Sequence, residues 1–219
     1  MSPNDYLLDL AREERIGVSE AVYCLSKSPE QVAAIVDHAQ AEGLRLLLTR
    51  LSSDKAALLP PESRAALNYD PESGTAVLGP IPQASGEASV AIVSAGTSDV
   101  PAAREASRTL EFHGETSTLF TDVGVAGLWR LLERREEIAT HRVVIAVAGM
   151  EGALFSVLGG LIGNPLIAVP TSTGYGVTEG GNAAMYSALG SCSPGVVAVN
   201  IDNGYGAACA ALRVLKHNS

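Results

Sequence analysis

The chain of 219 residues has few cysteines, few aromatic residues and few charged side chains, and each shortage excludes a class of protein. Its three cysteines, Cys24, Cys192 and Cys209, are widely spaced. No CxxC or CxxH pattern accompanies them, which argues against a zinc site or a disulfide framework and for a reducing compartment. The chain has 15 basic and 24 acidic residues, so its net charge is −9. We therefore expect no nucleic-acid partner.

Charge is scarcest in the C-terminal half of the chain. Between Gly152 and Ile201 the one charged residue is Glu179, and residues 153–170 have none. Glycines and Pro165 nevertheless interrupt this segment well short of the roughly 20 apolar residues that span a membrane. We therefore expect no membrane partner, and a segment that is buried in a core or in a subunit interface.

The beginning of the chain does not resemble a signal peptide. It carries Asp5 and Asp9 and lacks a basic start followed by a long apolar block. Together with the cysteine usage, this predicts a cytoplasmic protein. The 47% of hydrophobic residues against 18% of charged ones is typical of a folded chain.

We expect residues 1–80 to form a small α+β domain. We expect residues 81–88 to form a linker, because they are rich in Pro, Gly and Ser. Apolar spacing indicates a helix over Asp5–Ile16. Ser28-Pro29-Glu30-Gln31 is a start signal for a second helix that runs to Gln40 and stops at Gly43. Short apolar runs at Leu44–Thr49 and Thr75–Leu78 favour strands.

Residues 89–219 show a different rhythm, in which short β-branched runs alternate with helical segments. The runs are Ser89–Val93, Thr116–Phe120, Arg142–Val147, Leu166–Val169 and Val196–Ile201. The expected helices are Val100–Phe112, Val125–Ala139, Gly152–Ile162, Gly181–Leu189 and Tyr205–Leu215. This pattern predicts a three-layer, doubly wound α/β domain whose parallel sheet is covered on both faces. Ligands of such sheets bind at the carboxyl ends of the strands.

The first strand of this domain ends in a loop suited to an anion. The residues are Ser94, Gly96, Thr97, Ser98 and Asp99, and a helix with Pro101 in its first turn follows. Backbone N–H groups and two hydroxyls therefore converge at a helix N-terminus, which favours phosphate. The loop is neither GxGxxG nor a Walker A sequence, and Ser98 or Asp99 equally suits a plain helix cap.

Two further strand ends carry polar residues. Glu151 follows Gly149 and Met150, where it suits a general base or merely a favourable charge near the following helix. The next strand ends in a loop with hydroxyls and glycines, which favours ligand contact over a simple turn. The residues of this loop are Ser172, Thr173, Gly174, Tyr175 and Gly176.

Cys192 lies in a turn of small residues immediately before the last strand, and we expect it at the same sheet edge as the other loops. Cys209 sits among alanines on a helix face. A lone cysteine is most often a small buried hydrophobe, but its position makes Cys192 a candidate nucleophile. The four histidines fall on expected helices, chain ends or junctions, so no Ser/His/Asp set is proposed.

The segment Val90–Asp99, the strand end Ala146–Gly149 and the run Leu166–Pro170 resemble the aminoimidazole ribonucleotide carboxylase (PurE) family. The resemblance covers roughly Ser89–Lys216 and implies the same α/β fold. That family holds the substrate phosphate in a Gly-Ser-x-Ser-Asp loop and uses a histidine after the second strand. Here the corresponding loop, Phe120–Val125, has no histidine.

The whole chain more closely resembles the sister family, the carboxylase/hydrolase that begins nickel-pincer cofactor synthesis for lactate racemase (LarB, pyridinium-3,5-biscarboxylic acid mononucleotide synthase). The N-terminal residues that carry this likeness are Asp9–Arg15, Gly17, Glu20, Tyr23-Cys24, Lys27–Gln31 and Thr49-Arg50. The family's catalytic cysteine falls on Cys192 and its glutamate on Glu151. The resemblance implies carboxylation of nicotinic acid adenine dinucleotide at pyridinium C5 and cleavage of its phosphoanhydride to release AMP.

The resemblance and the expected reaction also indicate the co-substrate, the metal ion and the substrate contacts. Carbon dioxide or bicarbonate is the co-substrate, Mg²⁺ is expected near Asp99, and no tightly bound organic cofactor is expected. Phosphates would lie against the loop of Gly96 to Asp99, and the hydroxyl loop and Asn182 would contact the rest of the substrate. A homo-oligomer is expected, and the purine-carboxylase relatives form octamers. Two alternatives stay open, an aminoimidazole ribonucleotide carboxylase or mutase and a non-catalytic nucleotide-binding module.

Overall fold

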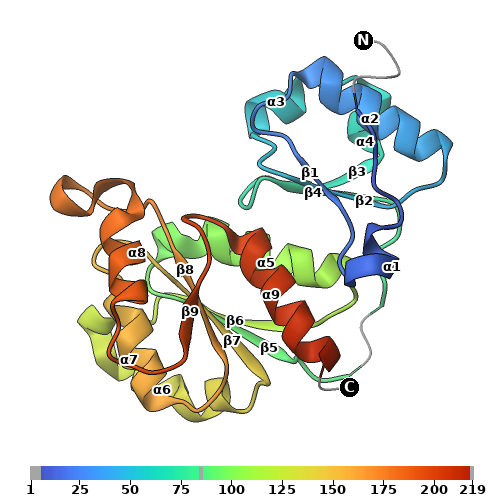
Figure 1. Ribbon diagram of the computed structural model, residues 1–219. Coiled ribbons are helices and arrows are strands. Elements are labelled where there is room, and N and C mark those ends of the chain that lie inside the picture. Colours follow the sequence, from blue (N-terminus) through green and yellow to red (C-terminus); the bar gives the residue numbers. More distant parts are fainter. Residues whose placement is uncertain (1–5, 84–85, 218–219) are drawn as a thin grey trace. The chain divides into compact units, whose positions relative to one another are not determined.

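The computed structural model describes residues 6–83 and 86–217, and the chain divides into two units after Gln83 (Figure 1). Asp5, at the start of the first expected helix, and residues 84–85 of the expected linker lie outside the described residues. No helix in the described ranges is long and apolar enough to cross a membrane.

A mixed four-stranded sheet forms the centre of the first unit, in the order β1-β2-β4-β3. Its strands are β1 (Ala21–Tyr23), β2 (Leu46–Thr49), β3 (Leu67–Asp70) and β4 (Thr75–Leu78). β1 runs parallel to β2, and the other pairs are antiparallel. The sequence missed β1 because it is only three residues long, and β3 because Asn68 and Asp70 resemble turn residues.

Four helices accompany this sheet: α1 (Arg12–Ile16), α2 (Pro29–Ala41), α3 (Ser53–Ala57) and α4 (Pro61–Ala65). The start signal of α2 is confirmed, because Ser28 and Gln31 form a reciprocal capping box with Pro29 at the first helical position. Val32, Ile35 and Val36 of α2 are buried in a core that includes residues of β2 and β4. The expected helix over Asp5–Ile16 is wrong in its extent, since α1 begins only at Arg12.

The second unit is the expected three-layer α/β fold. Its parallel sheet has the order β6-β5-β7-β8-β9, with β5 (Val90–Ser94), β6 (Ser117–Phe120), β7 (Val143–Ala148), β8 (Leu166–Pro170) and β9 (Val196–Ala198). The helices are α5 (Val100–Phe112), α6 (Leu128–Ala139), α7 (Ala153–Leu161), α8 (Asn182–Leu189) and α9 (Gly204–His217). Helices α5 and α9 cover one face and α6, α7 and α8 the other (Figure 1).

The central strands explain the apolar runs of the sequence. Every residue of β5, β7 and β8 is buried, as expected where helices cover both faces of a parallel sheet. The edge strand β9 ends at Ala198 and not at Ile201 as expected. The chain turns away there, and the N–H of Asp202 donates to the carbonyl of Pro170 at 2.8 Å.

Candidate active site

Hydrogen bonds join the loops that follow β5, β7 and β8 at the carboxyl edge of the sheet. The Thr171 hydroxyl donates to Asp99 Oδ1 at 2.6 Å, and the N–H of Gly96 donates to Asp99 Oδ2 at 2.9 Å. The N–H of Met150 donates to the carbonyl of Thr173 at 2.7 Å. The sequence brings these residues to one edge because all three strands are parallel.

Asp99 is the buried carboxylate of this edge, with 4% of its surface exposed. Burial raises its pKa above the ordinary value, while the hydrogen bonds from Thr171 and from the Gly96 N–H oppose that rise. It belongs to a short 3-10 turn, Thr97–Asp99, that leads into α5. Asp99 therefore ties loops together rather than facing solvent.

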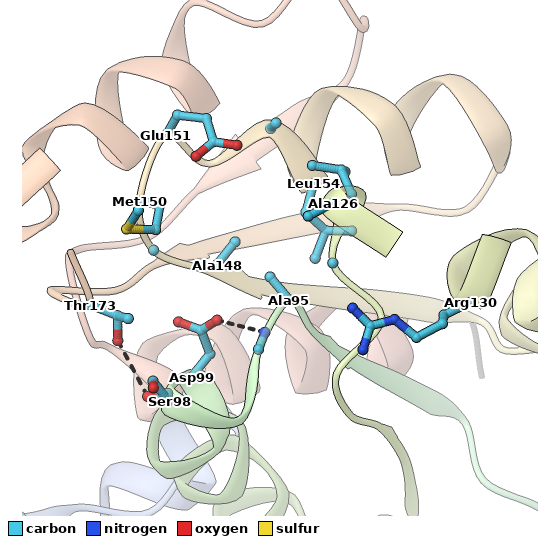
Figure 2. A pocket seen from close by; sticks show the side chains of 15 residues that line it. Ala95, Ser98, Asp99, Ala126, Arg130, Ala148, Met150, Glu151, Leu154 and Thr173 are labelled. Carbon is cyan, nitrogen blue, oxygen red and sulfur yellow. Dashed lines mark hydrogen bonds between the residues drawn. The ribbon is translucent and has the colours of Figure 1, made fainter. Parts of the chain in front are cut away.

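A cavity of about 320 Å³ opens between these loops and the start of α6 (Figure 2). Seven of the expected site residues line it: Gly96, Ser98, Asp99, Gly149, Met150, Glu151 and Thr173. Its other lining residues include the apolar Ala95, Val125, Ala126, Ala148, Ala153 and Leu154. Polar and apolar groups thus line the cavity together, which is typical of a small-molecule site.

Backbone geometry at the end of β7 brings Glu151 to the cavity. A Cβ on Gly149 would lie 2.2 Å from the carbonyl oxygen of Thr173, so glycine is required for the two loops to meet. Met150 has a φ of +52°, which is strained for a residue with a side chain. Glu151 itself is exposed, and Figure 2 shows it and Met150 on one side of the cavity, with Arg130 on the other.

The remaining expected loop residues do not line the cavity. Ser94 is buried, and its Oγ has no hydrogen-bond partner in the described structure. The N–H of Ser172 donates to Asp202 Oδ1 at 2.8 Å, and Tyr175 is 76% exposed. The others are Thr97, Gly174, Gly176 and Asn182, of which Asn182 begins α8.

The expectation that Cys192 shares the sheet edge of the other loops is wrong. The turn that holds it precedes β9, and because β9 is parallel to β8 its start lies at the opposite edge. This turn packs against α7, where the Ser193 hydroxyl donates to the carbonyl of Ser156 at 2.8 Å. Cys192 is exposed and is not among the residues that line the cavity.

The sequence analysis missed Arg130 and Thr171. Arg130 lines the cavity from the first turn of α6 and forms an ion pair with Asp122. Arg130 could have been found from the sequence, because it follows the loop after β6, and a cation there can reach the carboxyl edge of the sheet. Thr171 was passed over in favour of its neighbours Ser172 and Thr173, yet it is the buried hydroxyl of the loop, with 2% of its surface exposed.

The described residues contain no group of three or more metal-ligating side chains. Mg²⁺ was expected near Asp99, but each oxygen of this carboxylate already accepts a hydrogen bond. These residues therefore do not fit a metal ion held by protein side chains alone.

Comparison with known proteins agrees with the two units. Residues 6–80 match the LarB/PurE-like N-terminal domain, and residues 89–219 match AIR carboxylase. The second match and the cavity at the carboxyl edge define the class, an α/β enzyme of the carboxylase type. The chain belongs to the AIR carboxylase family, and its combination of the two domains is the LarB architecture.

A similar protein is the uncharacterized protein MJ0165 of Methanocaldococcus jannaschii. It is 48% identical over 120 residues, which are 54% of this chain and 46% of the relative. The match thus spans about half of the length of that curated relative.

Proposed function

We propose that the protein carboxylates the pyridinium ring of nicotinic acid adenine dinucleotide at C5 and hydrolyses its phosphoanhydride, which yields pyridinium-3,5-biscarboxylic acid mononucleotide and AMP. The observation that carries this choice is the composition of the cavity. Glu151 lines it, and the loop after β6 contributes Gly124 and Val125 but no histidine. The resemblance to aminoimidazole ribonucleotide carboxylases would require a histidine in that loop, which disfavours the purine reaction.

The chemistry explains the need for a thiolate and a carboxylate. A pyridinium ring is electron-poor, so its C5 does not attack carbon dioxide. Addition of the Cys192 thiolate to the ring gives a dihydropyridine, whose enamine carbon C5 then forms the bond to carbon dioxide. Glu151 takes the C5 proton, the electrons of that C–H bond restore aromaticity, and the C–S bond breaks to release the thiolate.

The proposed reaction requires Cys192 and Glu151 to act on the same ring. Glu151 lies at the carboxyl edge of the sheet and Cys192 in a turn at the amino edge. We propose that the two meet in a site between two copies of the chain. Exposed apolar side chains of the second unit, including Trp129, Tyr186 and Leu189, support a homo-oligomer.

The apolar side chains that line the cavity, including Val125, Ala126 and Leu154, suit carbon dioxide, which is small and carries no net charge. Water then attacks the phosphoanhydride and releases AMP. We propose that any Mg²⁺ would be held largely by the phosphate oxygens of the substrate, where it would offset their negative charge.

The test is incubation with the dinucleotide, Mg²⁺ and ¹³C-bicarbonate, followed by mass spectrometry for AMP and a labelled mononucleotide. The intact protein should form both, and Cys192→Ala should abolish the label. Cys209→Ala is the matched control, because Cys209 is half-buried in α9 and should leave turnover unchanged.

Two outcomes would replace the proposal. Carboxylation of aminoimidazole ribonucleotide in place of the dinucleotide would assign the protein to purine synthesis. Binding of the dinucleotide with no product from either substrate would assign a nucleotide-binding module.

A further inference from the structure

Arg130 is the one cation among the described residues that line the cavity, where the other charged side chains are Asp99 and Glu151. Its guanidinium reaches the cavity from α6, on the side away from Glu151 (Figure 2). An anionic ligand in this cavity would be repelled by both carboxylates wherever they are ionised. The cavity therefore needs a positive group for such a ligand, and Arg130 is in place to supply it.

Two residues that do not line the cavity fix where the guanidinium lies. Asp122 forms an ion pair with Arg130 through Oδ2 and Nη1, and it has a φ of +58°, a conformation that is unfavourable for a non-glycine residue. A Cβ on Gly127 would lie 2.7 Å from Arg130 Nε and 2.9 Å from Nη2. The guanidinium thus occupies the space that the missing Gly127 side chain leaves free.

The loop that carries these residues is itself held against the end of β5. A Cβ on Gly124 would lie 2.6 Å from the carbonyl oxygen of Ala95, so the two backbones approach too closely for a side chain there. Ala95 and Gly124 both line the cavity. The close approach brings the start of α6, and with it Arg130, to the cavity wall.

We propose that Arg130 binds an anionic oxygen group of the substrate, and that Asp122 and Gly127 are positioning residues that hold its guanidinium at the cavity. A guanidinium has five N–H donors, and the ion pair with Asp122 engages Nη1. The remaining donors suit a phosphate or a carboxylate. The nature of that group rests on the proposed function, whereas the presence of an anion site does not.

The test is calorimetric binding to the full chain of four ligands: inorganic phosphate, nicotinic acid mononucleotide, nicotinamide mononucleotide and nicotinic acid riboside. Arg130→Ala should weaken binding about 10- to 100-fold, as expected when a charged hydrogen-bond donor is lost. Arg130→Lys should restore part of the affinity, since it keeps the charge but not the fork of donors. Arg135→Ala, on the same helix and paired with Glu136, is the control and should bind like the original protein.

The positioning residues are tested by two variants that keep Arg130. Asp122→Asn removes the ion pair, and Gly127→Ala displaces the guanidinium. Both variants should therefore bind the same ligands more weakly, while the midpoint of their thermal unfolding stays unchanged. The dependence of the affinity on salt concentration should become weaker in Arg130→Ala but not in Arg135→Ala. A purely structural role of Arg130 would not produce this difference.

The ligand series separates the two sources of the anion. A loss confined to phosphate and the two mononucleotides assigns phosphate to Arg130, and a loss confined to the two nicotinic acid ligands assigns the ring carboxylate. Unchanged binding of all four ligands by Arg130→Ala would overturn the proposal. Weaker phosphate binding in a protein that carboxylates no pyridinium substrate would refute the proposed function and leave the anion site intact.

Discussion

The Thr171 hydroxyl donates a 2.6 Å hydrogen bond to Oδ1 of Asp99 and so links two residues that are 72 positions apart. Both residues are buried, with 2% and 4% of their surfaces exposed. The bond joins the loop after β8 to the turn before α5. It is one of the hydrogen bonds that hold together the loops at the carboxyl edge of the sheet.

Thr171→Val tests this contact. The substitution keeps the shape of the side chain but removes the Thr171 donor from Oδ1 of the buried Asp99, so we expect a loss of about 1.5 to 3 kcal/mol in the free energy of unfolding. Urea denaturation measures the loss. Thr171→Ser, which keeps the hydroxyl, should lose much less, and equal stability of the two variants would contradict the assignment.

Because Asp99 is buried, the stability of the folded protein should depend on pH. Burial raises its pKa above the ordinary value of 3.8. From about that pH upward the unfolded chain releases the proton before the folded protein does, so stability falls until Asp99 ionises in the folded state as well. Relative to Asp99→Asn, the original protein should therefore become less stable from pH 4 upward and reach a plateau.

Unfolding of the two proteins in urea at pH 4, 5, 6 and 7 measures this difference. Asp99→Asn retains one acceptor for Thr171, which makes it the closest uncharged substitute. A stability difference that instead grew in favour of the original protein with rising pH would show that the hydrogen bonds outweigh burial.

Cys24 and Cys192 should differ in reactivity. Burial raises the pKa of Cys24 to about 11, against the opposing charges of Lys55 and Lys27, and no part of Cys24 is exposed. Cys192 is exposed. At pH 8 iodoacetamide should therefore label Cys192 in the folded protein and spare Cys24, with peptide mass spectrometry as the readout.

Denaturant supplies the control for that experiment, because all three thiols should react in the unfolded chain. Labelling of Cys24 in the folded protein as fast as that of Cys192 would mean that the core of the first unit opens readily.

Gly149 should not tolerate a side chain. Alanine would place its Cβ 2.2 Å from the carbonyl oxygen of Thr173 and 2.6 Å from Thr171 Oγ1, so the two loops would have to separate. We expect Gly149→Ala to lose about 1 to 3 kcal/mol of stability and most ligand binding. Gly163→Ala is the matched control, since a Cβ there meets nothing within 4 Å.

The sequence predicted the periodic parts of the fold and missed the parts that depend on tertiary contacts. Val100–Phe112 and Thr75–Leu78 have the expected bounds, because a proline in the first helical turn and β-branched residues in a short run act locally. The short strand β1 lacks such a pattern and is defined by its pairing with β2. Glu151 was found at the cavity because a parallel sheet brings strand ends together.

The failures at the site have a physical cause as well. Cys192 was placed at the wrong edge because a turn before a parallel strand lies opposite the turns that follow the strands. Arg130 was missed because its approach to the cavity depends on Gly124 and Gly127, whose close contacts are visible only in three dimensions. Thr171 and Ser172 are adjacent hydroxyl residues, and only burial separates their roles.

The separation of Cys192 from the cavity yields the sharpest prediction about the assembly. Cys192→Ala and Glu151→Gln should each be inactive alone, because each lacks one reactive group. If a working site takes Glu151 from one chain and Cys192 from its neighbour, co-assembled chains of the two variants contain some sites with both groups intact. Random pairing across a two-fold interface restores about one quarter of the sites, whereas a site built within one chain restores none.

The measurement is labelled-product formation after the two variants have been dissociated in mild denaturant and reassembled together. Each variant carried alone through the same treatment is the control and should stay inactive. Recovery to about one quarter of the original activity supports the shared site between two-fold partners. No recovery, in a sample whose native mass spectrum shows mixed oligomers, would require Cys192 and Glu151 of the same chain to meet. The positions of their loops at opposite edges of the sheet argue against that outcome.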